Sequence, residues 1–466
     1  MTECKQQTFG FQGQKRREVK AGFDGGYVSS DGGILLLREV SERLGTLKRF
    51  SECFEDCRNP ILIEHTVEEL LSQRVYGLAC GYEDLNDHDE LRSDPAFALA
   101  IGKKDLEGKE RQREQDKGKS LAGRSTLNRL ELSGRVVKPN ERYKKIFCNE
   151  RKVGKFFVDE FVRSRRGKKV KRLILDLDRT GYPLYGEQEG RYFLKYYNDY
   201  CYTPLYIFCE EMLLQARLGT GDNAAFYGVT SELSFLIPEL KKHFPKARII
   251  VRGDGAFAIE EIMSFCEENG IDFIFGLPKN PVLERSSAAA MSEAEAKFSK
   301  TQTTVREFSE FYYKTRESWS RERRVIAKSE YSEQGANPRF VVTSLNRRCS
   351  SAMKMYEHWY CKRCDMENRI KEQLQLFGDR MSCEVKMANQ LRLWFTAVAY
   401  ILFAHLRRLA LRRTALAKAE VATIRAKILK IGARILISCR RVYFSLASAF
   451  PYKNIFAAAH RNLLKI

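Results

Sequence analysis

The sequence has few histidines, and its cysteines follow no regular spacing. It contains six histidines, none of them clustered, and thirteen cysteines at scattered positions. Zinc sites need Cys and His at characteristic separations, and the two close pairs, Cys361 with Cys364 and Cys53 with Cys57, lie far apart in the chain. An odd, scattered set of cysteines is typical of a reducing compartment. We therefore expect neither a zinc finger nor a disulfide framework.

Segments that would direct the chain to a membrane are also missing. Residues 1–20 are polar and basic and lack the apolar core of a secretion signal, so we interpret them as a loose arm. The longest apolar run, from Trp394 to Leu406, is too short to cross a bilayer and is followed by Arg407 and Arg408. We expect this run to form a buried helix in a cytoplasmic, nucleoid-associated protein with no membrane partner.

Acidic residues are outnumbered by basic ones. The 466 residues include 60 Asp and Glu against 81 Lys and Arg, which gives a net charge of +21. A surface this basic attracts a polyanion, with nucleic acid the first candidate and an anionic membrane the second. Hydrophobic residues make up 44% of the chain, enough to bury a real interior. The length favours two to four structural units.

The order of elements indicates a mixed α/β core with helical flanks. Apolar strand patterns at 173–177, 202–209 and 212–217 precede a helix–strand–helix–strand pattern that ends near residue 276. We divide the chain into a helical N-terminal DNA-binding region (1–165), the first part of the core (166–280), a β-rich insertion (281–355), the end of the core with an acidic helix (356–410) and a basic helical C-terminal region (411–466).

One helix of the N-terminal region is a candidate for DNA contact. It is expected to start near Ser125 and to expose Asn128 and Arg129, whose side chains are suited to base and phosphate contacts. An ordinary surface helix explains the same pattern equally well.

Two aspartates follow apolar strands. Asp178 ends a strand that starts at Leu173, and strand alternation places Asp176 on the same side as Asp178. Asp254 emerges where a second apolar strand stops. Converging carboxylates repel each other unless a cation neutralises them, and hard oxygen ligands suit Mg²⁺ or Mn²⁺. The pair of strand ends therefore predicts a metal-binding cleft.

The same residues permit a phosphatase interpretation. The motif Asp176-x-Asp178-x-Thr180 after an apolar strand resembles the opening motif of haloacid-dehalogenase-type phosphatases. Asp176 would then be the nucleophile, Asp178 the general acid, and Asp254 a ligand of Mg²⁺. The long basic region before this strand and the charge of +21 have no role in such an enzyme.

A third acid belongs to a cationic helix pattern, Tyr360-x-x-Arg363-x-x-x-Glu367. On a regular helix these three positions lie within about 60° of each other, and Lys371 shares their face. A carboxylate flanked by cations suits phosphate chemistry, with Glu367 at the metal and Arg363 and Lys371 on DNA phosphates. A salt-bridged surface helix is the competing interpretation.

Taken together, these segments resemble a DDE-type insertion-sequence transposase with a ribonuclease-H-like core. The likeness is greatest to the bacterial branch named insertion sequence thirteen-eighty, and it spans most of residues 20–460. The matching segments are Leu175–Gly181, Tyr185–Gly190, Pro204–Leu205, Arg217–Ala224, Ile249–Phe257, Tyr360–Glu372 and Lys427–Arg434.

The resemblance implies a function and a set of catalytic residues. Asp178, Asp254 and Glu367 would be the three catalytic acids and would hold two Mg²⁺ or Mn²⁺ ions. The enzyme would cut double-stranded DNA at terminal inverted repeats and join the ends to target DNA, as a homodimer. Relatives carry a lysine seven residues after the glutamate. Here that residue is Leu374, and Lys371 is the candidate substitute.

Two further residues are candidates for DNA contact. Arg252, next to Asp254, would offset phosphate repulsion by the acids. Trp319, among several arginines, would stack on a displaced base, although a core tryptophan explains its pattern as well. A catalytically silent DNA-binding protein derived from a transposase remains the other alternative to the enzyme.

Overall fold

The computed structural model describes residues 8–135 and 144–465. The chain forms two compact units. Of the described residues, one unit comprises 8–135, 144–149, 375–377 and 398–465, and the other comprises 150–374 and 378–397. The predicted arm at 1–20 falls partly on residues 1–7, which lie outside the described residues.

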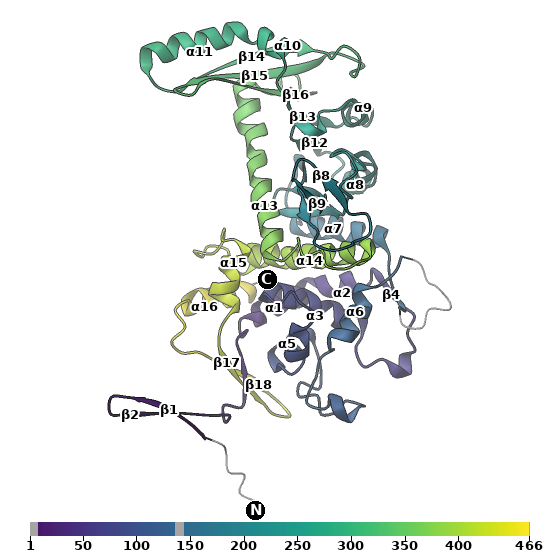
Figure 1. Ribbon diagram of the computed structural model, residues 1–466, viewed down its shortest axis with the longest axis vertical. Helices are drawn as coiled ribbons and strands as arrows, with labels where there is room; N and C mark the ends of the chain where they lie inside the picture. The colour runs from purple at the N-terminus through teal and green to yellow at the C-terminus, as the bar shows by residue number, and fades with distance from the viewer. Residues whose placement is uncertain (1–7, 136–143, 466) are drawn as a thin grey trace, which may run out of the picture. The chain divides into compact units, whose positions relative to one another are not determined.

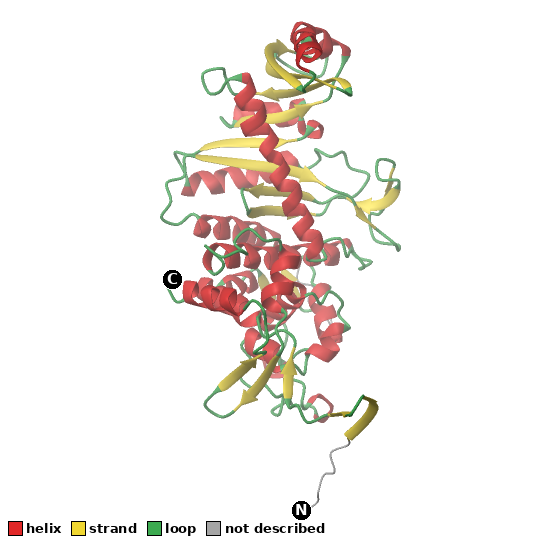
Figure 2. Cartoon of the chain, turned by 90° about the vertical axis from the view of Figure 1, so that its left-hand side faces the viewer, coloured by secondary structure: helices red, strands yellow, loops and turns green. Residues whose placement is uncertain are grey.

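The second unit is built on an eight-stranded mixed sheet. Its strand order is β11-β10-β6-β12-β13-β16-β15-β14, and strands are yellow in Figure 2. The strands are β6 (Arg172–Arg179), β10 (Leu205–Cys209), β11 (Met212–Arg217), β12 (Arg248–Gly253), β13 (Asp272–Leu277), β14 (Val305–Tyr313), β15 (Arg323–Ser332) and β16 (Gly335–Thr343); a separate small sheet holds β7 (Tyr182–Pro183), β8 (Tyr192–Leu194) and β9 (Asp199–Tyr202).

Helices pack on this sheet and connect its strands. α7 packs on β11 and α9 packs on β13, while α8 contacts both of these helices. The helices of the unit are α7 (Glu150–Ser164), α8 (Val229–His243), α9 (Glu260–Glu268), α10 (Pro281–Ser286), α11 (Ala288–Thr301), α12 (Ala352–Lys354), the π-helix η4 (Met355–Tyr360), the 3₁₀ helices η3 (Gly255–Phe257) and η5 (Cys361–Arg363), and α13 (Cys364–Gln375).

The first five strands confirm the ribonuclease-H-like prediction. β6, β10 and β11 form an antiparallel meander. After helical crossovers, β12 lies parallel to β6, and β13 lies parallel to β12. Most side chains of β6, β10, β11 and β12 are buried, and apolar residues predominate among them, as expected for a sheet covered by helices. In this topology the carboxyl ends of β6 and β12 meet at one edge.

The inserted segment continues the core sheet instead of forming a separate one. β16 pairs antiparallel with β13, and β15 and β14 add further antiparallel strands. Helix α11 lies along β14 and β15 (Figure 1). The insertion thus forms one edge of the core sheet, which the sequence pattern alone did not predict.

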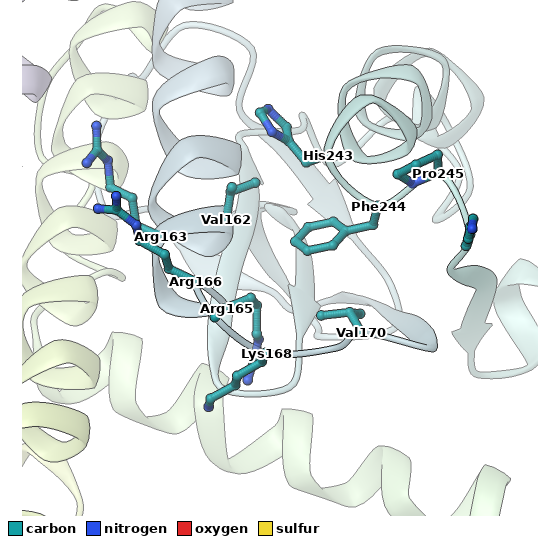
Figure 3. A pocket seen from close by; sticks show the side chains of 11 residues that line it. Val162, Arg163, Arg165, Arg166, Lys168, Val170, His243, Phe244 and Pro245 are labelled. Atoms are coloured by element: carbon teal, nitrogen blue, oxygen red, sulfur yellow. The ribbon is translucent and has the colours of Figure 1, made fainter.

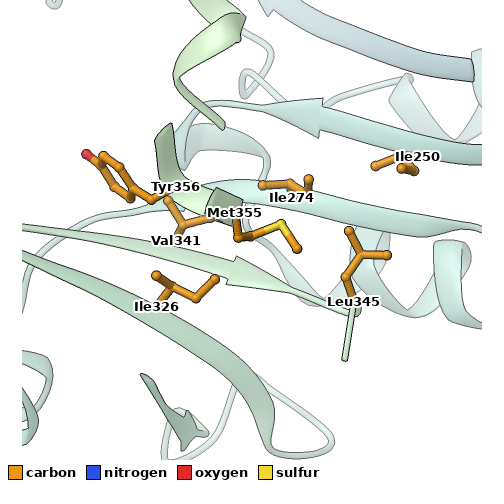
Figure 4. Close-up of a cluster of buried hydrophobic side chains, with 7 residues drawn as sticks. All are labelled: Ile250, Ile274, Ile326, Val341, Leu345, Met355 and Tyr356. Atoms are coloured by element: carbon orange, nitrogen blue, oxygen red, sulfur yellow. The ribbon is translucent and has the colours of Figure 1, made fainter. Parts of the chain in front are cut away.

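A compact apolar cluster fixes the irregular helix that precedes α13. Met355 and Tyr356 of η4 pack with side chains from four strands and from the turn after β16 (Figure 4). The cluster comprises Ile250, Ile274, Ile326, Val341, Leu345, Met355 and Tyr356. This packing secures the start of the segment that carries Tyr360, Arg363 and Glu367.

The first unit combines the N-terminal and C-terminal parts of the chain. Its strands β17 and β18 pair with each other, and β17 also pairs with β3. The prediction of a helical C-terminal region is therefore wrong for β17 and β18. The predicted boundary at 165 also shifts, because α7 belongs to the second unit. The elements are β1 (Thr8–Gln14), β2 (Arg17–Gly22), β3 (Tyr27–Ser29), α1 (Ile34–Leu44), α2 (Thr46–Ser51), β4 (Phe54–Asp56), η1 (Pro60–Leu62), α3 (Val67–Cys80), α4 (Asp87–Leu91), α5 (Pro95–Ile101), η2 (Glu114–Asp116), α6 (Arg124–Glu131), β5 (Ile146–Cys148), α15 (Val421–Ile424), η6 (Arg425–Leu429), β17 (Ala433–Ile437), β18 (Val442–Leu446) and α16 (Lys453–Leu463).

An ion pair joins the N-terminal and C-terminal parts of the chain within this unit. Asp31 is fully buried, forms an ion pair with Lys430 Nζ at 2.8 Å and accepts a hydrogen bond from the Tyr82 hydroxyl at 2.7 Å. Gly33 makes this approach possible, since a Cβ there would lie 1.8 Å from the carbonyl oxygen of Ile428. The glycines near residue 30 therefore serve close backbone contact as well as turn formation.

The apolar run at 394–406 lies within α14 (Lys386–Leu409), and Trp394 is fully buried. None of the helices in the described part of the chain has the length and apolar character needed to span a bilayer.

Candidate active site

Strand alternation places two aspartates at one edge of the sheet. β6 and β12 are parallel, and their register sets Arg252 beside Asp176, so the next positions along bring Asp178 beside Asp254. Asp254 follows the last residue of β12, and its Oδ1 accepts from Ala256 N at 2.9 Å, which caps η3. The end of each strand therefore presents a carboxylate.

The third acid reaches this edge through Arg363. The guanidinium of Arg363 lies 3.5 Å from Asp178 Oδ2 and 3.2 Å from Glu367 Oε1. Asp178 and Arg363 are largely buried, whereas the Glu367 side chain is 50% exposed. Arg363 thus bridges the first and third predicted acids, and Glu367 pairs with it across one helical turn.

The carboxylates share one electrostatic environment. Burial raises the pKa of Asp178 to about 6; the neighbouring carboxylates of Asp254 and Glu367 add to the rise, and Arg363 opposes it. The pKa of Arg363 is raised, because the attraction of Asp178 and the other acids outweighs the effect of burial. These shifts are the electrostatic signature of acids that face one another around a cation.

The helix predicted to carry Tyr360, Arg363 and Glu367 is not regular. Tyr360 ends the π-helix, Arg363 ends a 3₁₀ turn, and Glu367 lies in α13. The Tyr360 hydroxyl lies against β13, where a Cβ at Gly276 would come within 2.5 Å of that oxygen. Burial raises the pKa of Tyr360, and Asp254 contributes to the rise. Tyr360 therefore packs at the Asp254 turn. π-Helical segments are often found at functional sites.

Arg252 has a different environment from the one predicted. It is 5% exposed, its Nη2 lies 2.8 Å from Asp176 Oδ2, and its Nε also donates to that carboxylate. Its remaining donors bind the carbonyls of Trp359 and Lys362 in the irregular helix. We correct the sequence-based interpretation: Arg252 is committed to internal contacts and is not presented to DNA phosphate in this structure.

This pairing also bears on Asp176. Its carboxylate is 5% exposed and is held by a guanidinium, and burial raises its pKa. A nucleophile must be open to its substrate. The phosphatase alternative, which needs Asp176 in that role, gains no support from the structure.

Trp319 is likewise placed in the interior. It is 4% exposed, packs edge-on against Tyr313 at 5.4 Å, and its backbone N–H donates to Thr315 Oγ1 at 2.8 Å. Arg323, one of the arginines near Trp319 in the sequence, is paired with Glu260 and Glu267 at 2.7 and 2.8 Å. Trp319 lies in the loop between β14 and β15 and is buried there, so the core interpretation holds and base stacking by Trp319 does not fit this structure.

The remaining candidates are exposed. Lys371 lies on α13 one turn beyond Glu367, and Leu374 is 39% exposed. In the first unit, Asn128 and Arg129 are exposed on α6. Their surface positions are compatible with DNA contact.

A basic hollow occupies the opposite end of the same sheet. It has a volume of about 560 Å³ and is formed where α7 and α8 end, before β6 and β12 begin. Phe244, Val162 and Val170 contribute apolar wall (Figure 3). Six basic side chains surround it: Arg163, Arg165, Arg166, Lys168, His243 and Lys246. β6 spans eight residues, or about 25 Å, so this hollow is separate from the acids.

Sequence reasoning missed three features of this unit. It assigned no structural role to the Asp176–Arg252 pair, although both residues occupy a buried strand face. It did not single out the basic run at 163–169 or the tyrosines and phenylalanine at 192–200. The close spacing of aromatic residues at 192–200 was a signal in the sequence that could have identified this segment.

Fold and site together define a ribonuclease-H-like enzyme core with acids at the joined ends of two parallel strands. The family model "Transposase DDE domain group 1" matches residues 11–466, and the chain belongs to this family. It is a DNA transposase, and members of the family generally use divalent metal ions. A search of curated proteins gives no match.

A solved structure with overall similarity is the piggyBac transposase synaptic complex with hairpin DNA, determined by cryo-electron microscopy. It is 11% identical, with a TM-score of 0.39, and the match covers 93% of this chain and 81% of that one.

Proposed function

We propose that Asp178, Asp254 and Glu367 are the catalytic acids with which this transposase cuts the ends of an insertion-sequence-type element and joins them to target DNA. The observation that carries the proposal is geometric: Asp178 and Asp254 lie at the carboxyl ends of two neighbouring parallel strands, and Arg363 lies within ion-pair distance of both Asp178 and Glu367. A phosphoryl transfer of this type passes through an in-line displacement at phosphorus, which needs positioned charge and no covalent enzyme intermediate.

The chemistry of the donor set suits divalent cations. The three groups are carboxylates, which Mg²⁺ and Mn²⁺ prefer, and the pKa of Asp178 is raised by burial and, to a lesser extent, by the charges of Asp254 and Glu367, so a bound cation would favour its charged form. Among the described residues, no group of three such side chains closes on a common point, and the Arg363 guanidinium lies between two of them. When bound, two such ions would activate the attacking hydroxyl and stabilise the leaving oxygen.

The chain's own cations handle the phosphate. Arg363 is held by Asp178 and Glu367 and is positioned to transfer its donors to a phosphate oxygen that enters between the acids. Lys371, exposed on α13, adds a second positive charge. Tyr360 fixes the helix against the Asp254 turn.

DNA binding involves both units. The net charge of +21 supports binding of double-stranded terminal repeats and target DNA. Asn128 and Arg129 of α6 are candidates for sequence contact. Because two element ends must be joined together, we propose a homodimer that acts on chromosomal DNA in the cytoplasm.

The test uses the full chain and duplex DNA that carries the element's own ends. Asp178→Asn, Asp254→Asn and Glu367→Gln are each expected to lower Mg²⁺-dependent cleavage by at least about a hundredfold, while duplex binding persists. Asp365→Asn, an exposed acid on α13, is the matched control and should cleave normally. Normal cleavage by any of the three acid variants would remove that acid from the site. Hydrolysis of an aryl phosphate that is lost in Asp176→Asn but kept in Glu367→Gln would favour the phosphatase instead.

A further inference from the structure

Exposed aromatic side chains of the second unit gather on the small sheet β7–β9. This sheet is inserted between β6, which carries Asp178, and β10. Every large apolar side chain exposed between residues 182 and 202 is aromatic. Tyr196 is 86% exposed and Tyr192 is 52% exposed, with Phe193 and Tyr200 each above 40%. Large exposed apolar groups that cluster in this way mark an interaction site.

The hairpin holds these rings in a defined arrangement. β8 and β9 pair antiparallel with Phe193 directly opposite Tyr200, and the two rings meet edge to face at 5.5 Å. The turn uses Asn198 at a positive φ of 51°, a conformation that asparagine tolerates. Tyr196 and Tyr197 on this turn meet edge to face at 4.9 Å. The rings are therefore pre-arranged, although they are open to solvent.

The hairpin lies beside the proposed catalytic acids. Tyr197 packs against Gly181, which follows Asp178 by three residues; a Cβ at Gly181 would lie 2.7 Å from the Tyr197 ring. Burial raises the pKa of Tyr197, and the carboxylate of Asp178 contributes to the rise. A group held by the exposed rings would thus be close to the bond that is cut.

Cations are interleaved with the rings. The Arg191 guanidinium lies 4.6 Å from the Tyr200 ring centre, is fixed by the Gly186 carbonyl at 2.9 Å and pairs with Glu187 at 2.8 Å. Lys195 is exposed on the turn. Aromatic faces interleaved with cations characterise surfaces that bind single-stranded nucleic acid, because bases stack on the rings and the cations meet the backbone.

We propose that Phe193, Tyr196 and Tyr200 form a stacking platform for unpaired nucleobases of the DNA end held at the acids. A base inside an intact duplex cannot offer its face, so the occupant is a strand that has been unpaired next to the cut. The platform takes the role that sequence reasoning gave to Trp319. The inference rests on the proposed active site, since it names a part of the substrate recognised beside it.

The test compares a blunt duplex with the same duplex bearing a short single-stranded oligothymidine tail. Binding is measured by fluorescence anisotropy without divalent metal, so that cleavage plays no part. The paired replacement Phe193→Ala with Tyr196→Ala is expected to weaken binding of the tailed DNA by about tenfold per stacked base and to change blunt-duplex binding by less than about twofold. Tyr312→Ala, an aromatic 63% exposed on β14, is the matched control and should leave both affinities unchanged.

Two single replacements separate stacking from general apolar docking. Tyr196→Leu keeps an apolar side chain but loses the aromatic face, and it should bind the tail as weakly as Tyr196→Ala; Tyr196→Trp should bind at least as well as the native chain. 2-Aminopurine in the tail should be quenched by the native chain and not by the double alanine variant. Two results would overturn the platform: binding of the tailed DNA by Tyr196→Leu with the native affinity, or an equal loss of affinity for blunt and tailed DNA in the double alanine variant.

The same assay separates this inference from the proposed active site. Asp178→Asn should bind the tail normally while it fails to cleave. If Asp178→Asn cleaves normally and the aromatic variants still lose tail binding, the active-site proposal fails and the platform stands. If cleavage depends on the acids but tail binding is indifferent to the rings, the platform alone fails.

Discussion

Asp178 is a carboxyl group whose charged form is disfavoured by its surroundings. It lies at the end of a buried strand, faces two other acids and has one cation, Arg363, within ion-pair distance. Its pKa of about 6 is higher than the ordinary value of 3.8. The folded chain therefore holds this proton over a pH range in which the unfolded chain has released it.

The pKa of Asp178 predicts a pH-dependent stability difference. Because the pKa of Asp178 is raised in the folded chain, its protonated form stabilises the fold fully below about pH 4, and this stabilisation is lost as pH rises towards about 6. Near pH 7 the charged carboxylate therefore lowers the free energy of unfolding by up to about 3 kcal/mol. Asp178→Asn should raise the Tm near pH 7 and leave it unchanged below about pH 4. Mg²⁺ should raise the Tm of the native chain near pH 7 and that of the variant much less.

Differential scanning calorimetry across this pH range checks the prediction, and Asp365→Asn is the control, with no expected gain. Equal Tm values for native and Asp178→Asn chains near pH 7 would show that the charged carboxylate does not destabilise the fold.

At the scale of elements, one buried ion pair joins two strands to the helix that carries the third acid. Asp176 on β6 holds Arg252 on β12, and Arg252 donates to the carbonyls of Trp359 and Lys362. These carbonyls belong to π and 3₁₀ segments, where the regular α-helical hydrogen bonds are absent. Arg252 therefore stabilises the irregular backbone that sets the positions of Arg363 and Glu367.

Breaking this pair should separate stability from activity. Arg252→Met alone leaves a buried carboxylate without its partner and should lower the free energy of unfolding by about 3–5 kcal/mol. Asp176→Leu combined with Arg252→Met should restore most of that stability, yet cleavage should stay low because both carbonyls have lost their donor. Denaturant unfolding measures the stability and cleavage assays measure the activity. Hydrogen exchange over residues 355–367 should be faster in both variants, because the backbone there has lost its donor.

Arg323→Met is the matched control, since Arg323 is a buried arginine in the same unit, paired with Glu260 and Glu267. It should lower stability without selectively increasing exchange at 355–367. Recovery of both stability and cleavage in the double variant would contradict a positioning role for Arg252.

Much of the element pattern was predictable from local sequence. β11 lies at the predicted residues 212–217, and β6 covers the predicted strand at 173–177. α8, β12, α9 and β13 follow in the predicted helix–strand–helix–strand order, and β13 ends at Leu277, close to the predicted end at residue 276. Apolar periodicity sets these elements because each has one buried face or is buried on both. The pairing of β16 with β13 was not predictable, since register depends on long-range contacts between residues some seventy positions apart.

At the scale of the whole molecule, excess positive charge is distributed beyond the proposed site. The basic hollow beneath β6 and β12 is lined by five Lys and Arg side chains and by His243, and Arg166 and Lys168 among them are exposed. Cations near the C-terminal ends of α7 and α8 are favoured by the helix dipole, which explains part of their presence. Their convergence on one hollow suits a DNA phosphate remote from the cut.

Charge reversal at the hollow should weaken DNA binding without impairing the chemical step. Arg166→Glu with Lys168→Glu is expected to lower duplex affinity by tenfold or more at low salt and to reduce the slope of log K against log salt by about one for each phosphate that is no longer neutralised. Cleavage at saturating DNA should be unchanged. Lys241→Glu with Lys300→Glu alters charge equally on exposed helix surfaces outside the hollow and serves as control. An equal decrease in the control would show that net charge alone accounts for the effect.

The sequence by itself determined the class of protein, the mixed core and the three candidate acids. Strand alternation and the ends of apolar runs are local properties, and Asp178 and Asp254 follow from them. Only the tertiary structure decided the roles of the neighbouring side chains, because burial depends on what packs from distant parts of the chain. That packing commits Arg252 to Asp176, buries Trp319 and leaves the aromatic hairpin exposed beside Asp178.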